Sequence, residues 1–135
     1  MILRIKRKHV DLLRQEAQKV DPIEACALLF GNIHGNKVLV RKVVVTDNKL
    51  HSTRRFEISA ETAVDSMAAA EREGLEFIGF FHSHPAPATP SQVDLQFMRL
   101  WGDAVWLILS LTDRELKAYQ LKDGEVRKIT MNVIV

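Results

Sequence analysis

The stretch that decides both the fold and the site is FFHSHPAPATPSQVD, residues 80–94. Its two histidines, His82 and His84, are separated by one residue and follow an apolar run that begins at Glu76. Residues two apart do not face each other on a helix, but on a strand they share a face, with Cα atoms about 6.6–6.8 Å apart. Two imidazoles at that separation can converge on one metal ion at about 2.0–2.1 Å. The spacing therefore predicts a strand over residues 76–82 whose end carries a two-histidine metal site.

The same stretch offers a third metal ligand. Three prolines make residues 85–90 an irregular loop, and Ser91 begins a predicted helix that runs to about Trp101. Asp94 lies one turn into that helix, where its carboxylate could reach back to both imidazoles and leave a fourth position for water. Water on such a zinc ion ionises near pH 7, and a further carboxylate is needed to accept the proton. Since none occurs within the motif, the general base has to come from elsewhere in the chain.

Each of these features also has a purely structural explanation. The two histidines could be ordinary strand residues, and Ser91 with Asp94 fits a capping box whose acid is favoured by the helix dipole. Asp21 and Glu24 likewise fit a helix cap followed by a carboxylate in the first turn. The hypothesis of a metal site depends on all the features occurring together.

The rest of the chain shows the patterns of an α/β protein. Apolar stripes and serine caps predict helices over residues 7–19, 59–73 and 91–101, with a further helix start at 21–22. Valine-rich and alternating segments predict strands over residues 37–45, 76–82, 104–111, 115–121 and 126–133, with turns at 31–36 and 122–125. The apolar run 25–30 is too short to assign. This order predicts a single mixed-sheet domain over residues 1–135 with helices packed on the sheet.

Composition limits the class of protein. The chain has 135 residues, of which 47% are hydrophobic and 27% charged, as in a soluble globular protein. Without a long apolar run or a signal peptide, the expected location is the cytoplasm and no membrane partner is expected. The net charge of +2 and the absence of basic clusters interleaved with aromatics favour no nucleic-acid partner. Cys26, the single cysteine, is expected to be a buried core thiol.

Taken together with Glu24, these residues resemble a known family. Glu24 ahead of ACALLFG, then HSHP at 82–85 and Ser91-x-x-Asp94, is similar to the signature of the JAMM (MPN+) zinc metalloproteases. That signature is a glutamate, then His-Ser/Thr-His-Pro, then Ser-x-x-Asp. Because the chain is also small, it most resembles the prokaryotic or archaeal isopeptidases for ubiquitin-like proteins. These are related to the deubiquitinase of the proteasome lid. The resemblance implies the JAMM/MPN fold, which is cytidine-deaminase-like.

The resemblance implies a role for each motif residue. Glu24 would be the general acid/base that activates the zinc-bound water. Ser91 would help to stabilise the tetrahedral oxyanion, and Ser83 would support the loop. One catalytic Zn²⁺ ion would be held by His82, His84 and Asp94.

The implied substrates are protein conjugates. The family hydrolyses isopeptide (or peptide) bonds at the C-terminus of ubiquitin or ubiquitin-like modifiers, and an alternative is release of an amino acid or peptide from a sulfur-carrier protein. A second alternative is a non-catalytic MPN scaffold, and the chain could also join a homo-oligomer through its apolar end, 133–135, or a larger complex. The five-residue loop 86–90 is one residue shorter than is common in the family. The compact chain predicts weak discrimination between linkages.

Overall fold

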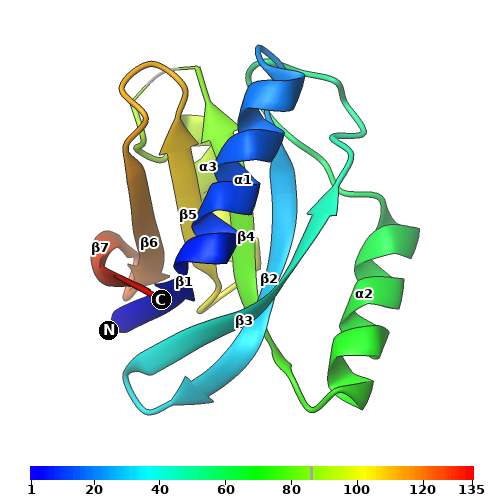
Figure 1. The fold of residues 1–135 in the computed structure, drawn as a ribbon. Helices are drawn as coiled ribbons and strands as arrows, with labels where there is room; N and C mark the ends of the chain where they lie inside the picture. The colour runs from blue at the N-terminus through cyan, green and yellow to red at the C-terminus, as the bar shows by residue number, and fades with distance from the viewer. Residues whose placement is uncertain (86) are drawn as a thin grey trace.

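The computed structural model describes residues 1–85 and 87–135, so that Ala86, within the predicted 85–90 loop, lies outside the described residues. Seven strands and three helices follow one another along these residues (Figure 1). In chain order they are β1 (Ile2–Lys6), α1 (Arg7–Val20), β2 (Cys26–His34), β3 (Lys37–Thr46), α2 (Ala60–Arg72), β4 (Glu76–His84), α3 (Gln92–Leu100), β5 (Val105–Ser110), β6 (Leu116–Lys122) and β7 (Glu125–Ile134).

The strands form one mixed sheet that closes on itself in the order β1-β3-β2-β4-β5-β6-β7. Parallel pairing joins β1 to β3, β4 to β5 and, across the closure, β1 to β7. The predicted mixed α/β class is therefore confirmed, whereas the closure into a barrel was not predicted. It depends on β1, a five-residue strand that the sequence patterns did not reveal.

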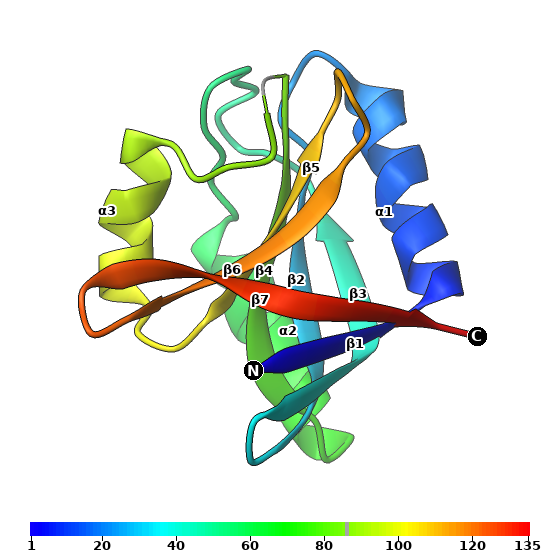
Figure 2. The ribbon, with the colours of Figure 1, turned by 90° about the vertical axis from the view of Figure 1, so that its left-hand side faces the viewer.

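Two hydrophobic clusters lie on the two faces of the sheet. One contains Leu13 and Ala17 of α1 together with Leu29 of β2 and Phe81 of β4. The other contains Ala70 of α2 and Met98 of α3, with residues from the opposite face of the same strands. Figure 2 shows α1 and α3 on opposite sides of the sheet. The central strands β2, β4 and β5 are thus covered on both faces, which explains their nearly continuous apolar sequences.

The helices form for the reasons that their sequences indicate. The stripe of Val10, Leu13 and Ala17 is the buried face of α1. Ser59 caps α2 by accepting a hydrogen bond from the backbone N–H of Thr62. Gly74 follows the end of α2 with a φ of 75°, a conformation that a glycine adopts without strain. The helices predicted over residues 7–19, 59–73 and 91–101 are therefore confirmed to within one or two residues.

Several predicted boundaries were wrong. No helix begins at Asp21-Pro22, because residues 21–25 form a turn and a short link into β2. The turn predicted at 31–36 is shorter, since β2 continues to His34 and reverses at Gly35-Asn36. At the apolar end, 133–135, one edge of β7 pairs with β1 as far as Ile134. Cys26, by contrast, is buried as expected.

Strand β4 carries the histidines and lies very close to β5. A Cβ atom on Gly79 would lie 1.9 Å from the carbonyl oxygen of Val105, so only glycine fits there. The strand continues through His84 rather than ending near His82, and it pairs with β5 up to Ser110. The histidines are thus held on regular backbone that is paired with a neighbouring strand. None of the helices in the described part of the chain is long and apolar enough to cross a membrane.

Candidate metal centre

His82 and His84 end strand β4 and project from the same face of the sheet. Their Nε2 atoms are 2.9 Å apart, and the two residues are only 0% and 5% exposed. The Nδ1 atom of His84 faces the carbonyl oxygen of Pro87 at 3.5 Å. A proton on that Nδ1 leaves Nε2 as a lone-pair donor, the form of histidine that binds metals.

Asp94 reaches the histidines from the first turn of α3. Its Oδ2 atom lies 3.2 Å from Nε2 of His82 and 3.1 Å from Nε2 of His84. The carboxylate also accepts a hydrogen bond from the backbone N–H of Ser91, while the Ser91 hydroxyl accepts one from the backbone N–H of Asp94. This capping box fixes the start of α3 and, with it, the direction of the carboxylate. The capping explanation and the metal explanation of Asp94 are therefore compatible.

The three converging atoms fit a metal ion. Around a tetrahedral ion with bonds of about 2.0–2.1 Å, ligand atoms are about 3.3–3.4 Å apart. The Nε2 and Oδ2 atoms are 2.9–3.2 Å apart, so only a small outward adjustment separates them from that geometry. With both histidines protonated at Nδ1, all three atoms present lone pairs to one point in a buried space, and a cation there would satisfy all of them.

Glu24 supplies a second carboxylate at the same place. One of its oxygens and one nitrogen of each of His82 and His84 lie within 4.8 Å of one another, so these three residues could also hold a metal ion. The Asp94 Oδ2 atom lies within 3.2 Å of Nε2 of both histidines, well inside this limit. Glu24 is 1% exposed, and its Oε1 has no hydrogen-bond partner among the described residues.

The backbone around Glu24 is fixed by three side-chain and main-chain contacts. Its N–H donates to the carbonyl of Ser52, and its carbonyl accepts from the side-chain amide of buried Asn48. The next N–H, of Ala25, donates to the hydroxyl of Ser83 at 2.8 Å. Ser83, which was expected to support the loop rather than to take part in the chemistry, thus ties β4 to the segment that carries Glu24.

The ionisation states of His82, Asp94 and Glu24 suit a metal site. In the metal-free chain the pKa of His84 is raised, because burial, which lowers it, is outweighed by the hydrogen bond to Asp94. Burial lowers the pKa of His82, which favours the neutral imidazole. Burial opposes ionisation of Asp94, but hydrogen bonds from His82 and His84 outweigh it and hold the pKa of the carboxyl below its usual range. Burial raises the pKa of Glu24 to about 7, against the smaller opposing effect of His84. A carboxyl group with that pKa can both accept and release a proton near neutral pH.

The sequence patterns did not predict Phe56, an aromatic residue that packs against the site. Phe56 stacks on the His82 ring with centroids 4.8 Å apart, and it comes from the loop before α2. It also lines an apolar pocket of about 340 Å³ beside the histidine. No motif marks Phe56 or Asn48 in the sequence, because both reach the site only through contacts between distant segments. The apolar pocket is further lined by Phe80, Phe97, Trp101 and Trp106.

Comparisons of the sequence with known proteins find JAB-domain proteins, desampylases and a deubiquitinase. A family described as prokaryotic homologs of the JAB domain matches residues 6–122. A desampylase of Pyrococcus furiosus is 40% identical over 102 residues, which cover 75% of this chain and 69% of the relative. A desampylase of Haloferax volcanii is 30% identical, with 89% and 85% covered. The deubiquitinase BRCC36 of Camponotus floridanus is 26% identical, and the match covers 89% of this chain and 55% of that protein.

Solved structures agree with the fold. The solution structure of a protein from Desulfitobacterium hafniense superimposes with a TM-score of 0.88 at 26% identity, covering 98% of this chain and 92% of the other. A second solution structure, of a protein from Salinibacter ruber, gives a TM-score of 0.71 at 27% identity, with 96% and 91% covered. The match therefore extends over almost the whole of each structure.

Proposed function

The chain belongs to the prokaryotic JAB-domain family, within the JAMM (MPN+) group, and from this premise we propose that it is a zinc-dependent isopeptidase for ubiquitin-like modifiers. Its reaction would be hydrolysis of the bond between the C-terminal carbonyl of the modifier and an amine, in most conjugates that of a lysine. The observation that carries the proposal is the meeting of His82, His84 and Asp94 at one buried point beside Glu24. The names of the relatives, two desampylases and a deubiquitinase, support the class of substrate.

In this proposal one catalytic zinc ion is held by His82, His84 and Asp94. Two neutral imidazoles and one carboxylate form a ligand set that leaves a position open. When bound, the ion would act as a Lewis acid that polarises the scissile carbonyl and lowers the pKa of water to about 7. Asp94 suits the ligand position better than Glu24, because its Oδ2 lies within 3.2 Å of both Nε2 atoms.

Glu24 is the general base and then the general acid. The unpartnered Oε1 accepts a proton from the attacking water, whose oxygen adds to the carbonyl carbon of the substrate. When the carbon–nitrogen bond breaks, the same carboxyl group returns the proton to the leaving amine. The pKa of about 7 matches this double role, since either protonation state is accessible near neutrality.

Ser91 stabilises the oxyanion in this scheme. Its hydroxyl oxygen accepts the Asp94 N–H, which orients the group and leaves the hydroxyl hydrogen available to donate. A donor that is already oriented stabilises developing negative charge without reorganisation at the moment of reaction. The apolar pocket beside His82 is suited to an apolar side chain in the modifier tail, and its exposed lining residues include Leu50 and Trp101, 44% and 42% exposed.

The proposal is tested with a ubiquitin-like protein joined through its C-terminus to a lysine. Wild-type protein should cleave this conjugate, a chelator should abolish cleavage, and stoichiometric zinc should restore it. Release of a C-terminal amino acid or short peptide from a sulfur-carrier protein, without cleavage of the conjugate, would favour the first alternative. Binding of the conjugate by zinc-loaded protein with no hydrolysis of either substrate would overturn the enzyme proposal and favour the scaffold.

A further inference from the structure

The barrel has a wedge where β6 and β7 separate. The two strands pair from Lys122–Glu125 as far as Ala118–Ile129. Beyond this point β7 pairs with β1 instead, starting at Thr130. Figure 2 shows β7 crossing in front of the sheet towards β1 as it leaves β6. Leu116 on β6 and Met131 on β7 therefore have no partner in the strand that faces them across the wedge.

Unpaired strand edges of this kind can accept an added strand. On its other side β6 is already paired with β5, Leu116 with Leu109. Only the edge that faces the wedge is available, and an extended peptide placed there could pair with main-chain N–H and C=O groups. Such main-chain pairing requires a partner with an extended backbone, and a small anion has no backbone to pair.

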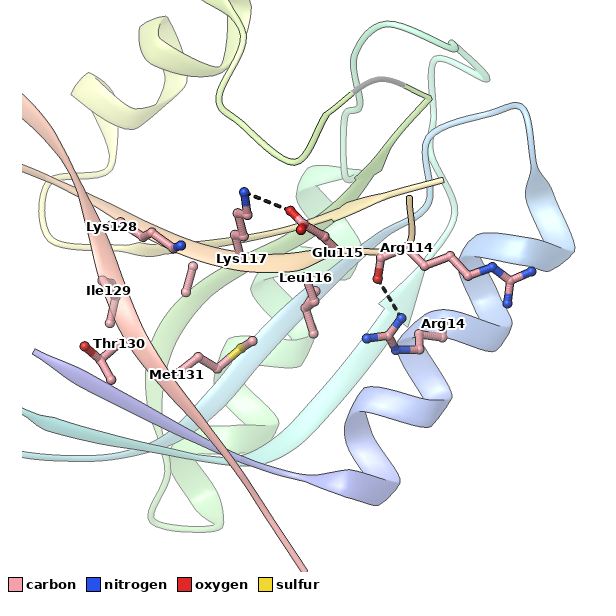
Figure 3. Close-up of a pocket in the computed structure, with 10 residues that line it drawn as sticks. Arg14, Arg114, Glu115, Leu116, Lys117, Lys128, Ile129, Thr130 and Met131 are labelled. Carbon is pink, nitrogen blue, oxygen red and sulfur yellow. Dashed lines mark hydrogen bonds and ion pairs between the residues drawn. The ribbon is translucent and has the colours of Figure 1, made fainter. Parts of the chain in front are cut away.

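A groove of about 620 Å³ lies in the wedge (Figure 3). Its floor is apolar and belongs to the core cluster between α1 and the sheet, so that the barrel interior reaches the surface here. The volume lies within the range of ligand pockets, about 300–1,000 Å³. No aromatic residue occurs among the lining residues, which disfavours single-stranded nucleic acid because its bases need stacking partners. The floor residues are Leu116, Ala118, Ile129 and Met131.

The rim of the groove is basic. Lys117 and Lys128 extend from the two diverging strands on the face opposite to Leu116 and Met131, and Arg14 reaches the groove from α1 (Figure 3). Glu115 is the single acidic residue among the described lining residues, and it is paired with Lys117 at 2.9 Å. Arg14 donates to the carbonyl of Arg114 at 2.8 Å, which joins α1 to the loop before β6. The Arg114 side chain points away from the groove (Figure 3). Among the described lining residues, Arg14, Lys117 and Lys128 against Glu115 leave two net positive charges at the rim.

We propose that this groove binds an extended acidic segment of a partner protein by strand addition between β6 and β7. Alternating side chains of a strand point to opposite faces, so apolar residues of the segment can cover Leu116 and Met131 while acidic residues face the basic rim. Charge complementarity favours an acidic partner over a second copy of this chain, whose own groove and net charge are positive. The proposal does not rest on isopeptidase activity.

The test uses the full chain and a fluorescein-labelled eight-residue peptide in which glutamate alternates with valine. Fluorescence anisotropy should show saturable binding that weakens as salt is raised. The double variant Lys117→Glu/Lys128→Glu should lose at least about tenfold in affinity. The matched control is Lys8→Glu/Lys37→Glu, which makes the same change of charge at exposed positions outside the groove and should bind as wild type does.

A second measurement identifies the edge and does not depend on any variant. In amide NMR spectra of the wild-type protein, the peptide should shift the resonances of Leu116, Lys117 and Met131. Exchange with solvent should slow for the amides of Leu116 and Met131, whereas the Lys117 amide already faces Ile108 of β5. No saturable binding, equal losses in the two double variants, or shifts confined to residues outside the groove would each overturn the proposal. A peptide in which lysine alternates with valine should not bind, and binding of it as tightly as of the acidic peptide would also contradict it.

Discussion

At the scale of single residues, the site depends on how Glu24 is buried. Its carboxyl group has a folded-state pKa of about 7, above the ordinary value of 4.5, because burial penalises the charge. Between these two pH values the metal-free folded chain holds a proton that the unfolded chain has released. The stabilising effect of the protonated carboxyl group is therefore complete below pH 4.5 and is lost as the pH rises through 7.

This linkage predicts a pH-dependent effect of Glu24→Gln in chelator-treated protein. As the pH rises from 4.5 to 7, the variant should gain stability relative to wild type by up to about 1.4 kcal/mol per pH unit. Urea unfolding at about pH 5 and about pH 8 measures this difference. The control Glu71→Gln removes one exposed carboxylate from α2. A constant difference between wild type and Glu24→Gln at both pH values would contradict the burial argument.

Ser83 is predicted to position Glu24. Its buried hydroxyl accepts the Ala25 N–H, and Ser83→Ala would leave that donor without its partner, at a cost of about 1–3 kcal/mol. Because Ala25 follows Glu24 directly, the turnover rate for conjugate cleavage should fall while the zinc content is unchanged. Ser59→Ala is a matched control, since loss of the α2 cap costs about 1 kcal/mol away from the site. If both variants lose equal stability and neither loses turnover, Ser83 has only a structural role.

Residues that carry a motif could be placed from sequence, and residues that act through distant contacts could not. The His-x-His spacing on an apolar run was sufficient to predict that both imidazoles share a face. The serine cap at Ser91 was sufficient to predict the start of the helix that carries Asp94 in its first turn. Phe56 and Asn48 lie in a polar loop with no periodic pattern. Their contacts with His82 and Glu24 exist only once β2, β4 and that loop have packed together.

At the scale of elements, the pairing of β4 with β5 fixes the positions of His82 and His84. A side chain on Gly79 would collide with backbone atoms of Val105, the closest at 1.9 Å, and backbone cannot move aside as a flexible side chain can. Gly79→Ala should therefore separate the two parallel strands at the base of the segment that ends in His82 and His84. The expected result is a loss of several kcal/mol in stability together with weaker zinc binding.

The control for this prediction is Gly35→Ala in the turn between β2 and β3. Gly35 has a φ of 62°, and no atoms lie within 4 Å of the position that an added methyl group would take. The cost should therefore be about 1 kcal/mol and arise from backbone strain alone. Calorimetric unfolding and zinc titration of both variants would separate the two effects. Equal destabilisation by the two substitutions would show that the close approach of β4 and β5 is not important.

The same scale shows why the barrel closure was not predictable. β1 is only five residues long, and the helix α1 follows it directly at Arg7 without a turn between them. Its two partners, β3 and β7, lie far along the chain, so no local pattern specifies the pairing. β1 is extended because it pairs with β3 and β7, and this pairing exists only in the assembled sheet.

At the scale of the whole molecule, metal binding and folding should be coupled. The proposed ligands come from β4 and α3, which converge only in the folded chain, so zinc should bind the folded state in preference to the unfolded state. Free zinc at about a hundredfold excess over its dissociation constant should add about 2.7 kcal/mol of stability. Thermal unfolding with and without zinc measures this shift. Asp94→Asn should reduce it strongly, whereas Glu24→Gln should retain it, and the opposite order would make Glu24 the third ligand.

The central claim is that Glu24 moves the proton in a hydrolysis that depends on the metal held by His82, His84 and Asp94. The most direct measurement is the rate of conjugate cleavage by wild type and by Glu24→Gln, each with its zinc content determined. We expect equal zinc content and a loss of about 10²–10⁴-fold in the rate for the variant, the range that general acid–base catalysis contributes. Equal rates at equal zinc content would contradict it, because the carboxyl group at position 24 would then have no part in the reaction.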